Sequence, residues 1–182
     1  MSEQKRVSNI TIEGAKLIFR NFSGKVTEFN KNGNMSFSVL LDDDLAAQLE
    51  NDGWNVKYRK PREDDPDQYR QPFLPVKIKF GMYPPTVVII TSRGKKRLDE
   101  NTIGQLDWVR IQNADVQIRP FTYPAMQGRP EGISAYLKTL YVTIIEDPLD
   151  TKYADIPDID VMPGQMELPF DTWFIFKEKI WL

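Results

Sequence analysis

Basic residues gather in one short segment of the chain, and they are the first side chains that could do chemistry. The segment "TSRGKKR" places Arg93, Lys95, Lys96 and Arg97 directly after an apolar run. Cations so close together can neutralise neighbouring phosphates and release their counterions. The segment is not a nucleotide-hydrolase phosphate loop, because the spacing G-x-x-x-x-G-K-[ST] is absent. A solubilising surface loop is the alternative interpretation.

Further cations are predicted to share strand faces with aromatic rings. In "FLPVKIKF" the apolar residues alternate with lysines, so the lysines should lie opposite the core. The same alternation applied along the chain predicts three outward-facing groups: Lys57 with Arg59, Lys77 with Lys79, and Arg119 with Phe121 and Tyr123. Rings stack on bases while cations bind phosphates, so these groups favour single-stranded nucleic acid as the ligand.

The composition excludes much of enzyme chemistry. The chain has no histidine and no cysteine, so it has no imidazole base, no thiol nucleophile and no zinc site built on these ligands. Asp42, Asp43 and Asp44 could bind a divalent cation, but capping of a helix also explains them. We therefore predict no catalytic residue, metal or cofactor, and keep a carboxylate metal nuclease as a weak alternative.

The elements that must position these residues are mostly strands. Period-two alternation predicts strands near 10–12, 35–41, 54–59, 73–80, 86–91, 111–123 and 133–145. "DDDLAAQLENDG" predicts a short helix that ends at Gly53, and "LDENTIGQLDW" a helical turn. Five or more strands with one or two short helices fit an OB-fold-like barrel, with a β-sandwich as the structural alternative.

Charge divides the chain into two parts. Residues 1–145 carry 21 Lys and Arg against 17 Asp and Glu, whereas 146–171 carry one lysine against eight acidic residues. We therefore expect a nucleic-acid-binding domain over 1–150 and a flexible acidic tail over 151–182. No apolar run approaches the roughly 20 residues needed to cross a bilayer, and residues 1–9 lack a signal-peptide core. These features predict a soluble cytoplasmic protein.

Two long segments resemble a known family. "TVVIITSRGKKRLDENTIG" and "VQIRPFTYPAMQGRPEGISAYLKTLYVTIIED" are similar to the C-terminal half of the OB-fold in bacteriophage single-stranded DNA-binding proteins, and "FSVLLDDDLAAQLE" resembles that family's strand-to-helix step. The resemblance covers residues 36–150. It implies binding of single-stranded DNA during phage replication, recombination or repair in the bacterial host, without catalysis. The positions that match its DNA-facing elements are Arg93, Lys95, Lys96, Phe121 and Tyr123.

The resemblance also implies a role for the acidic segment. It implies a disordered tail that competes with DNA for the basic surface and recruits replication or recombination proteins of phage or host through its tip. "MELPF" resembles that tip, with Glu167, Leu168, Pro169 and Phe170 as partner-binding residues. The chain departs from the pattern because the apolar segment 172–182 follows Phe170. That segment could dock on the body, extend the motif or form homo-oligomers.

The function predicted from the sequence is therefore sequence-independent binding of single-stranded DNA. The alternative from another class is a phage interaction factor that uses an OB-like scaffold to bind or inhibit a host protein.

Overall fold

The computed structural model describes residues 7–61, 63–65, 68–153 and 155–156. They belong to two units, of which the first ends at Glu146 and the second begins at Asp147. The described part of the second unit contains one short helix, α2 (Pro148–Lys152), whose first turn is capped by the Asp147 carboxylate. In the described ranges, no helix is long and apolar enough to cross a membrane.

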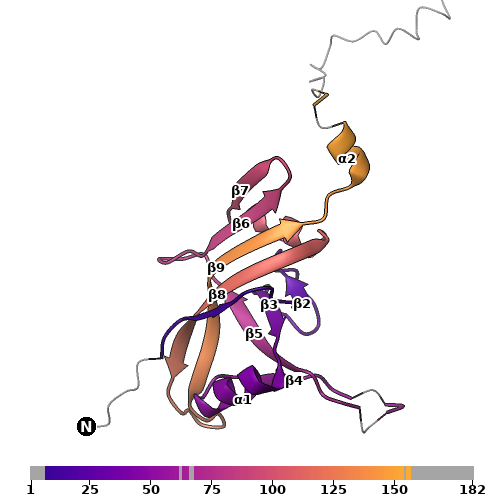
Figure 1. Ribbon diagram of the computed structural model, residues 1–182. Coiled ribbons are helices and arrows are strands. Elements are labelled where there is room, and N and C mark those ends of the chain that lie inside the picture. The colour runs from indigo at the N-terminus through magenta and orange to yellow at the C-terminus, as the bar shows by residue number, and fades with distance from the viewer. Residues whose placement is uncertain (1–6, 62, 66–67, 154, 157–182) are drawn as a thin grey trace, which may run out of the picture. The chain divides into compact units, whose positions relative to one another are not determined.

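The described residues of the first unit form one nine-stranded sheet (Figure 1). Its strands are β1 (Ile10–Ile12), β2 (Leu17–Asn21), β3 (Met35–Leu40), β4 (Lys57–Tyr58), β5 (Pro72–Ile78), β6 (Thr86–Thr91), β7 (Gly94–Leu98), β8 (Ile111–Tyr123) and β9 (Gly132–Ile144). Helix α1 (Asp43–Asn51) follows β3, and the 3₁₀ helix η1 (Ile103–Asp107) follows β7. The mostly β prediction is confirmed.

The sheet closes on itself through its first two strands. β1 pairs with β8 and β2 pairs with β3, while the path between them runs β8–β9–β5–β3. The short connection from β1 to β2 continues both pairings, because the Ala15 N–H donates to the Ala114 carbonyl and the Leu40 N–H donates to the Lys16 carbonyl. β5 and β9 are parallel and the other path pairs antiparallel. This order is that of an OB-fold barrel.

The core lies inside this barrel and follows the predicted alternation. On β5, Leu74, Val76 and Ile78 are buried, whereas Lys77 between them is exposed. Phe22 and Phe37 stack at the centre with ring centroids 5.2 Å apart, and both are fully buried. Since neighbouring positions on a strand point to opposite faces, this packing fixes which cations and rings remain outside.

Helix α1 forms where the sequence predicts it. The Asp42 carboxylate accepts a hydrogen bond from the Leu45 N–H at 2.7 Å, which makes Asp42 the cap of the helix. Gly53 follows with a φ of 91°, a conformation that favours glycine. In the part of the chain with described positions, no group of three or more acidic side chains could hold a metal ion.

Two local predictions are wrong. Residues 91–97 form a hairpin between β6 and β7 and not a loop, because Lys95, Lys96 and Arg97 pair with Ile90, Ile89 and Val88. The strand expected over 54–59 is reduced to β4, because the Trp54 N–H donates to the Leu49 carbonyl at the end of α1 and the Asn55 N–H donates to the Ile133 carbonyl, so only Lys57 and Tyr58 pair with β5.

Candidate nucleic-acid interface

Three strands bring their outward-facing side chains together around Tyr136. On β9, Tyr136 pairs with Lys77 of parallel strand β5 and with Arg119 of antiparallel strand β8. The ammonium nitrogen of Lys77 lies 5.7 Å from the centroid of the Tyr136 ring, and the guanidinium carbon of Arg119 lies 6.0 Å from it. Both distances are within reach of a cation–π attraction. The phenol ring therefore lies close to two cations.

Phe121 completes this arrangement on the β8 side. Its ring meets that of Tyr136 edge to face, with centroids 5.6 Å apart and an interplanar angle of 68°. Phe121 is 56% exposed, so much of its ring surface faces solvent. We call the set of Lys77, Lys79, Arg119, Phe121 and Tyr136 the Tyr136 cluster.

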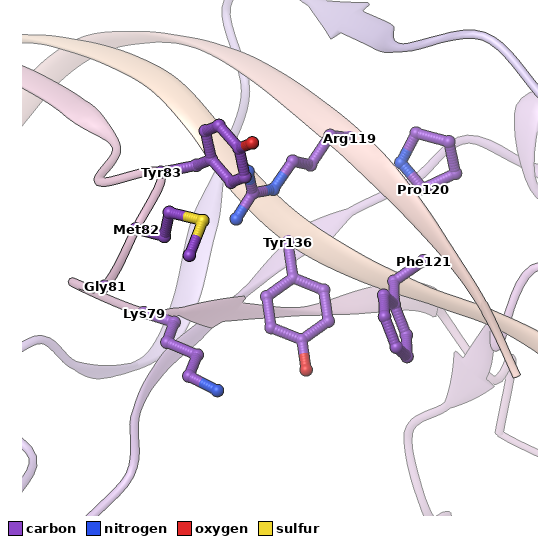
Figure 2. Close-up of a pocket in the computed structure, with 8 residues that line it drawn as sticks. All are labelled: Lys79, Gly81, Met82, Tyr83, Arg119, Pro120, Phe121 and Tyr136. Atoms are coloured by element: carbon purple, nitrogen blue, oxygen red, sulfur yellow. The ribbon is translucent and has the colours of Figure 1, made fainter.

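A shallow pocket of about 450 Å³ opens over this cluster. Its lining comes from the β5–β6 connection, β8 and β9, and consists of Lys79, Gly81, Met82, Tyr83, Arg119, Pro120, Phe121 and Tyr136. Figure 2 shows the Tyr136 ring in the middle of this set, with Lys79 on one side and Phe121 on the other. The two charged lining residues, Lys79 and Arg119, are both cations, so the pocket suits a flat ring that carries a phosphate.

Tyr123 lies on the same outer face but has close neighbours of its own. The guanidinium carbon of Arg129 lies 3.9 Å from the centroid of the Tyr123 ring. The phenol also lies over Gly132, where an added Cβ would come within 2.5 Å of the hydroxyl oxygen. Glycine at 132 thus makes room for Tyr123, while Arg129 lies against its ring.

A second aromatic and basic group lies on β2, β5 and the segment after β4. The rings of Phe19 and Phe73 meet edge to face at 5.4 Å, and the guanidinium carbon of Arg59 lies 5.8 Å from the Phe19 centroid. Lys57 pairs with Phe73 across β4 and β5. We call Phe19, Phe73 and Arg59 the Phe19 cluster. The predicted pair Lys57 and Arg59 thus lies near Phe73 of β5, whereas the predicted pair Lys77 and Lys79 lies at the other end of that strand and just beyond it.

The β6–β7 hairpin carries the remaining predicted cations. β6 pairs with the C-terminal half of β9, and the hairpin lies at the opposite end of the sheet from α1 (Figure 1). Lys95 and Arg97 lie opposite Ile90 and Val88, whereas Lys96 shares the other face with buried Leu98. The three cations therefore do not share one face, because a strand alternates where the predicted loop would not.

The tip of this hairpin is held by a carboxylate. Glu146 accepts a hydrogen bond from the Ser92 N–H at 2.8 Å. Hydrogen bonds from the Ser92 side chain and backbone lower the pKa of Glu146, and the charge of Arg93 lowers it further. Because the folded pKa is the lower one, this contact is fully present above the ordinary pKa of a glutamate and is lost as the pH falls through the lowered value.

Sequence reasoning missed several residues of these clusters. Tyr136, Tyr83, Met82, Phe19 and Phe73 were not predicted as site residues, and Trp108, which lies in neither cluster, is 84% exposed. Alternation could have predicted that Tyr136 faces outward, because the residues on either side, Ala135 and Leu137, are apolar and both are buried in the structure. The predicted partner-binding residues Glu167, Leu168, Pro169 and Phe170 lie outside the described residues.

Barrel order and side-chain placement define an OB-fold protein with cations and aromatic rings on its outer face. The phage ssDNA-binding domain family matches residues 1–179, and the chain belongs to this family. No curated protein matches the sequence.

Two solved structures have distant likeness to the chain. The single-stranded DNA-binding protein of bacteriophage Enc34 in complex with ssDNA has 14% identity and a TM-score of 0.47, over 77% of this chain and 88% of that one. Gp2.5, a single-stranded DNA-binding protein encoded by bacteriophage T7, has 11% identity and a TM-score of 0.40, over 85% of this chain and 97% of that one. Membership of the family rests on the family match over residues 1–179 and not on these two structures.

Proposed function

We propose that this protein binds single-stranded DNA without sequence preference, on the outer face of β5, β8 and β9. One observation carries the proposal: the Tyr136 ring lies between the cations Lys77 and Arg119 and beside the exposed Phe121 ring. Every base has a flat face that can stack on such rings, while the cations pair with the phosphates on either side. The match to the phage ssDNA-binding domain family supports this assignment.

Single strands fit this surface better than duplex DNA. The rings of the Tyr136 cluster can contribute stacking only if bases are unpaired and can leave the helical stack. A duplex would offer its phosphates to the same cations but would keep its bases away from Tyr136 and Phe121. Stacking is worth about 1–3 kcal/mol per base, so we expect a clear preference for single strands.

The test is a titration of a labelled oligothymidylate of about 12 nucleotides, within the range of about 4–16 that one OB-fold covers. Fluorescence anisotropy at several salt concentrations gives both the affinity and its salt slope. We expect tight binding of the single strand at low salt and much weaker binding of a duplex of the same length. Equal affinity for single-stranded and duplex DNA would contradict the proposal.

Charge position is tested by a matched pair of double variants. Lys77→Gln with Lys79→Gln should lower the salt slope by about 0.7 for each phosphate that is no longer neutralised. Lys16→Gln with Arg110→Gln removes the same charge from two exposed positions outside the Tyr136 cluster. If both double variants lose the same affinity, net charge alone and not the cluster would explain the binding.

The finer part of the proposal concerns the role in the infected cell. We infer action in phage DNA replication, recombination or repair in the cytoplasm of the bacterial host, without catalysis by the protein itself. Eight acidic residues over 146–171 support a tail that competes with DNA. The residues "ELPF" at 167–170 support recruitment of partner proteins through an apolar tip with acidic neighbours.

A further inference from the structure

The Phe19 cluster combines aromatic rings with a cation, as the Tyr136 cluster does, but the binding surface proposed above does not include it. Phe19 is 59% exposed, meets Phe73 edge to face, and lies 5.8 Å from the guanidinium carbon of Arg59. A ring that buries less than half of its surface contributes little to the core. Packing therefore does not account for a phenylalanine at this position.

The backbone at Phe19 makes an aromatic residue there more unusual. Its φ is 49°, and it is the one non-glycine residue of the described ranges with a positive φ. It lies in the irregular part of the β2–β3 pairing, between Ile18 and Asn21. A bulge residue in the left-handed conformation is normally glycine, because a side chain strains this backbone. Strained residues that persist are concentrated at binding sites.

The path from the Phe19 cluster to the Tyr136 cluster follows one strand. Phe73 and Lys77 lie on the same face of β5, separated by about 13 Å at about 3.3 Å per residue. Their neighbours on β3 are Leu40 and Ser36. Strands β3 and β5 contain no acidic residue, so no like charge on them would repel a phosphate chain between the clusters.

We infer that the Phe19 cluster is a second base-stacking subsite for single-stranded DNA. One strand runs along the outer face of β5, with one base on Phe19 and another at Tyr136. Arg59 pairs with a phosphate next to the base on Phe19, and Lys77 with a phosphate near Tyr136. This inference rests on the proposed function, because it extends the same binding surface.

The test compares oligothymidylates of about two and about 12 nucleotides. The two bases of a dinucleotide lie closer together than the about 13 Å between Phe73 and Lys77, so only the longer strand can reach both clusters. Phe19→Ala should weaken binding of the longer strand about tenfold or more, and should reduce the difference in affinity between the shorter strand and the longer one. Phe19→Tyr keeps a flat ring and should bind like the unchanged protein. Trp108→Ala removes an exposed ring outside both clusters and should leave both affinities unchanged.

A second measurement does not depend on the folding of a variant. Irradiation of the unchanged protein with a longer strand that carries 5-iodouracil should cross-link peptides that contain Phe19 and Tyr136, as identified by mass spectrometry. Cross-links at Tyr136 without any at Phe19 would overturn the subsite. The subsite would also be overturned if Phe19→Ala bound the longer strand within twofold of the affinity of the unchanged protein while Tyr136→Ala bound it clearly more weakly. In both results the proposed function would stand. The proposed function fails if the unchanged protein shows no preference for single strands.

Discussion

Tyr136 owes its surroundings to residues far from it in the sequence. Lys77 reaches it across the parallel β5–β9 pair, and Arg119 across the antiparallel β8–β9 pair. Both cations lie near its ring, and Phe121 meets it from the side. One ring thus joins side chains from three strands, which makes it the most informative single position to change.

We expect Tyr136→Ala to weaken binding of single-stranded DNA by about 1–3 kcal/mol, because the stacked base loses its platform. The salt slope should hardly change, since no cation is removed. Tyr136→Phe keeps the ring and should retain the affinity. Anisotropy titrations at several salt concentrations measure both quantities. A fall in slope without a fall in affinity at high salt would assign Tyr136 a role other than stacking.

Sequence alternation predicts which face of a strand a residue lies on, but not which residues of distant strands meet. Alternation alone correctly placed Lys77, Arg119 and Phe121 outside the barrel, because neighbouring residues such as Val76 and Ile118 had to be inside. Alternation does not say which strands are neighbours. The meeting of Tyr136 with Lys77 depends on a parallel pairing between distant segments, and the outward turn of Trp108 depends on how η1 ends.

At the scale of elements, the β6–β7 hairpin is the clearest departure from prediction. The cluster of cations in "TSRGKKR" suggested a loop, but residues 94–98 pair with β6 as a strand, with Leu98 buried opposite Val87 and Lys96 exposed opposite Ile89. Pairing with β6 therefore gives Lys95 and Arg97 one face and Lys96 the other. This difference changes the expected effect of substitutions.

The double variant Lys95→Ala with Arg97→Ala should lower the salt slope more than the double variant Lys95→Ala with Lys96→Ala, which removes the same charge. The reason is that Lys95 and Arg97 share the face of the hairpin opposite the core, whereas Lys96 lies on the other face. Each phosphate that is left without its cation should reduce the slope by about 0.7. Anisotropy titrations against salt measure the effect. Unchanged slopes in the folded double variant would remove the hairpin from the binding surface.

Helix η1 holds the beginning of the long β2–β3 connection. The Asp107 carboxylate accepts hydrogen bonds from the Phe22 and Ser23 N–H groups at 2.7 and 2.9 Å. The Arg20 guanidinium donates to the Leu106 and Val109 carbonyls, both at 2.9 Å. These contacts join two segments that are far apart in the sequence, so η1 stabilises the start of the β2–β3 connection.

Asp107→Ala should lower the free energy of unfolding by about 1–3 kcal/mol, because two backbone N–H groups lose a charged acceptor. Urea denaturation measures the change, with Asp99→Ala as a control for removal of an exposed aspartate whose hydrogen bonds are local. DNA affinity of the folded variant should stay unchanged, since Asp107 lies outside both clusters. A urea midpoint equal to that of the unchanged protein would show that the Asp107 contacts do not stabilise the β2–β3 connection.

At the scale of the whole molecule, opposite charges occupy different parts of the chain. The barrel region carries more basic than acidic residues, while 146–171 carries eight acidic residues and one lysine. A tethered polyanion can compete with phosphate for the same cations at an effective concentration in the millimolar range. The acidic segment would then weaken DNA binding without touching the bases.

Deletion of 155–182 removes five of those eight acidic residues and should tighten binding of single-stranded DNA at low salt. Affinities of the full chain and the deletion should converge at high salt, because the screening length is already about 8 Å at physiological ionic strength. Paired anisotropy titrations give the comparison, and thermal melting shows whether the barrel remains folded. Equal affinities at low salt would exclude competition, and a lower melting temperature would indicate that 172–182 contributes to stability.

We propose that single-stranded DNA lies on the outer face of β5, β8 and β9, around Tyr136. The most direct test is a titration of ¹⁵N-labelled full-length protein with an oligothymidylate of about 12 nucleotides, followed by two-dimensional NMR. We predict the largest backbone shift changes at Lys77, Lys79, Arg119, Phe121 and Tyr136, with little change in helix α1. Shift changes concentrated on α1, with none around Tyr136, would contradict the claim.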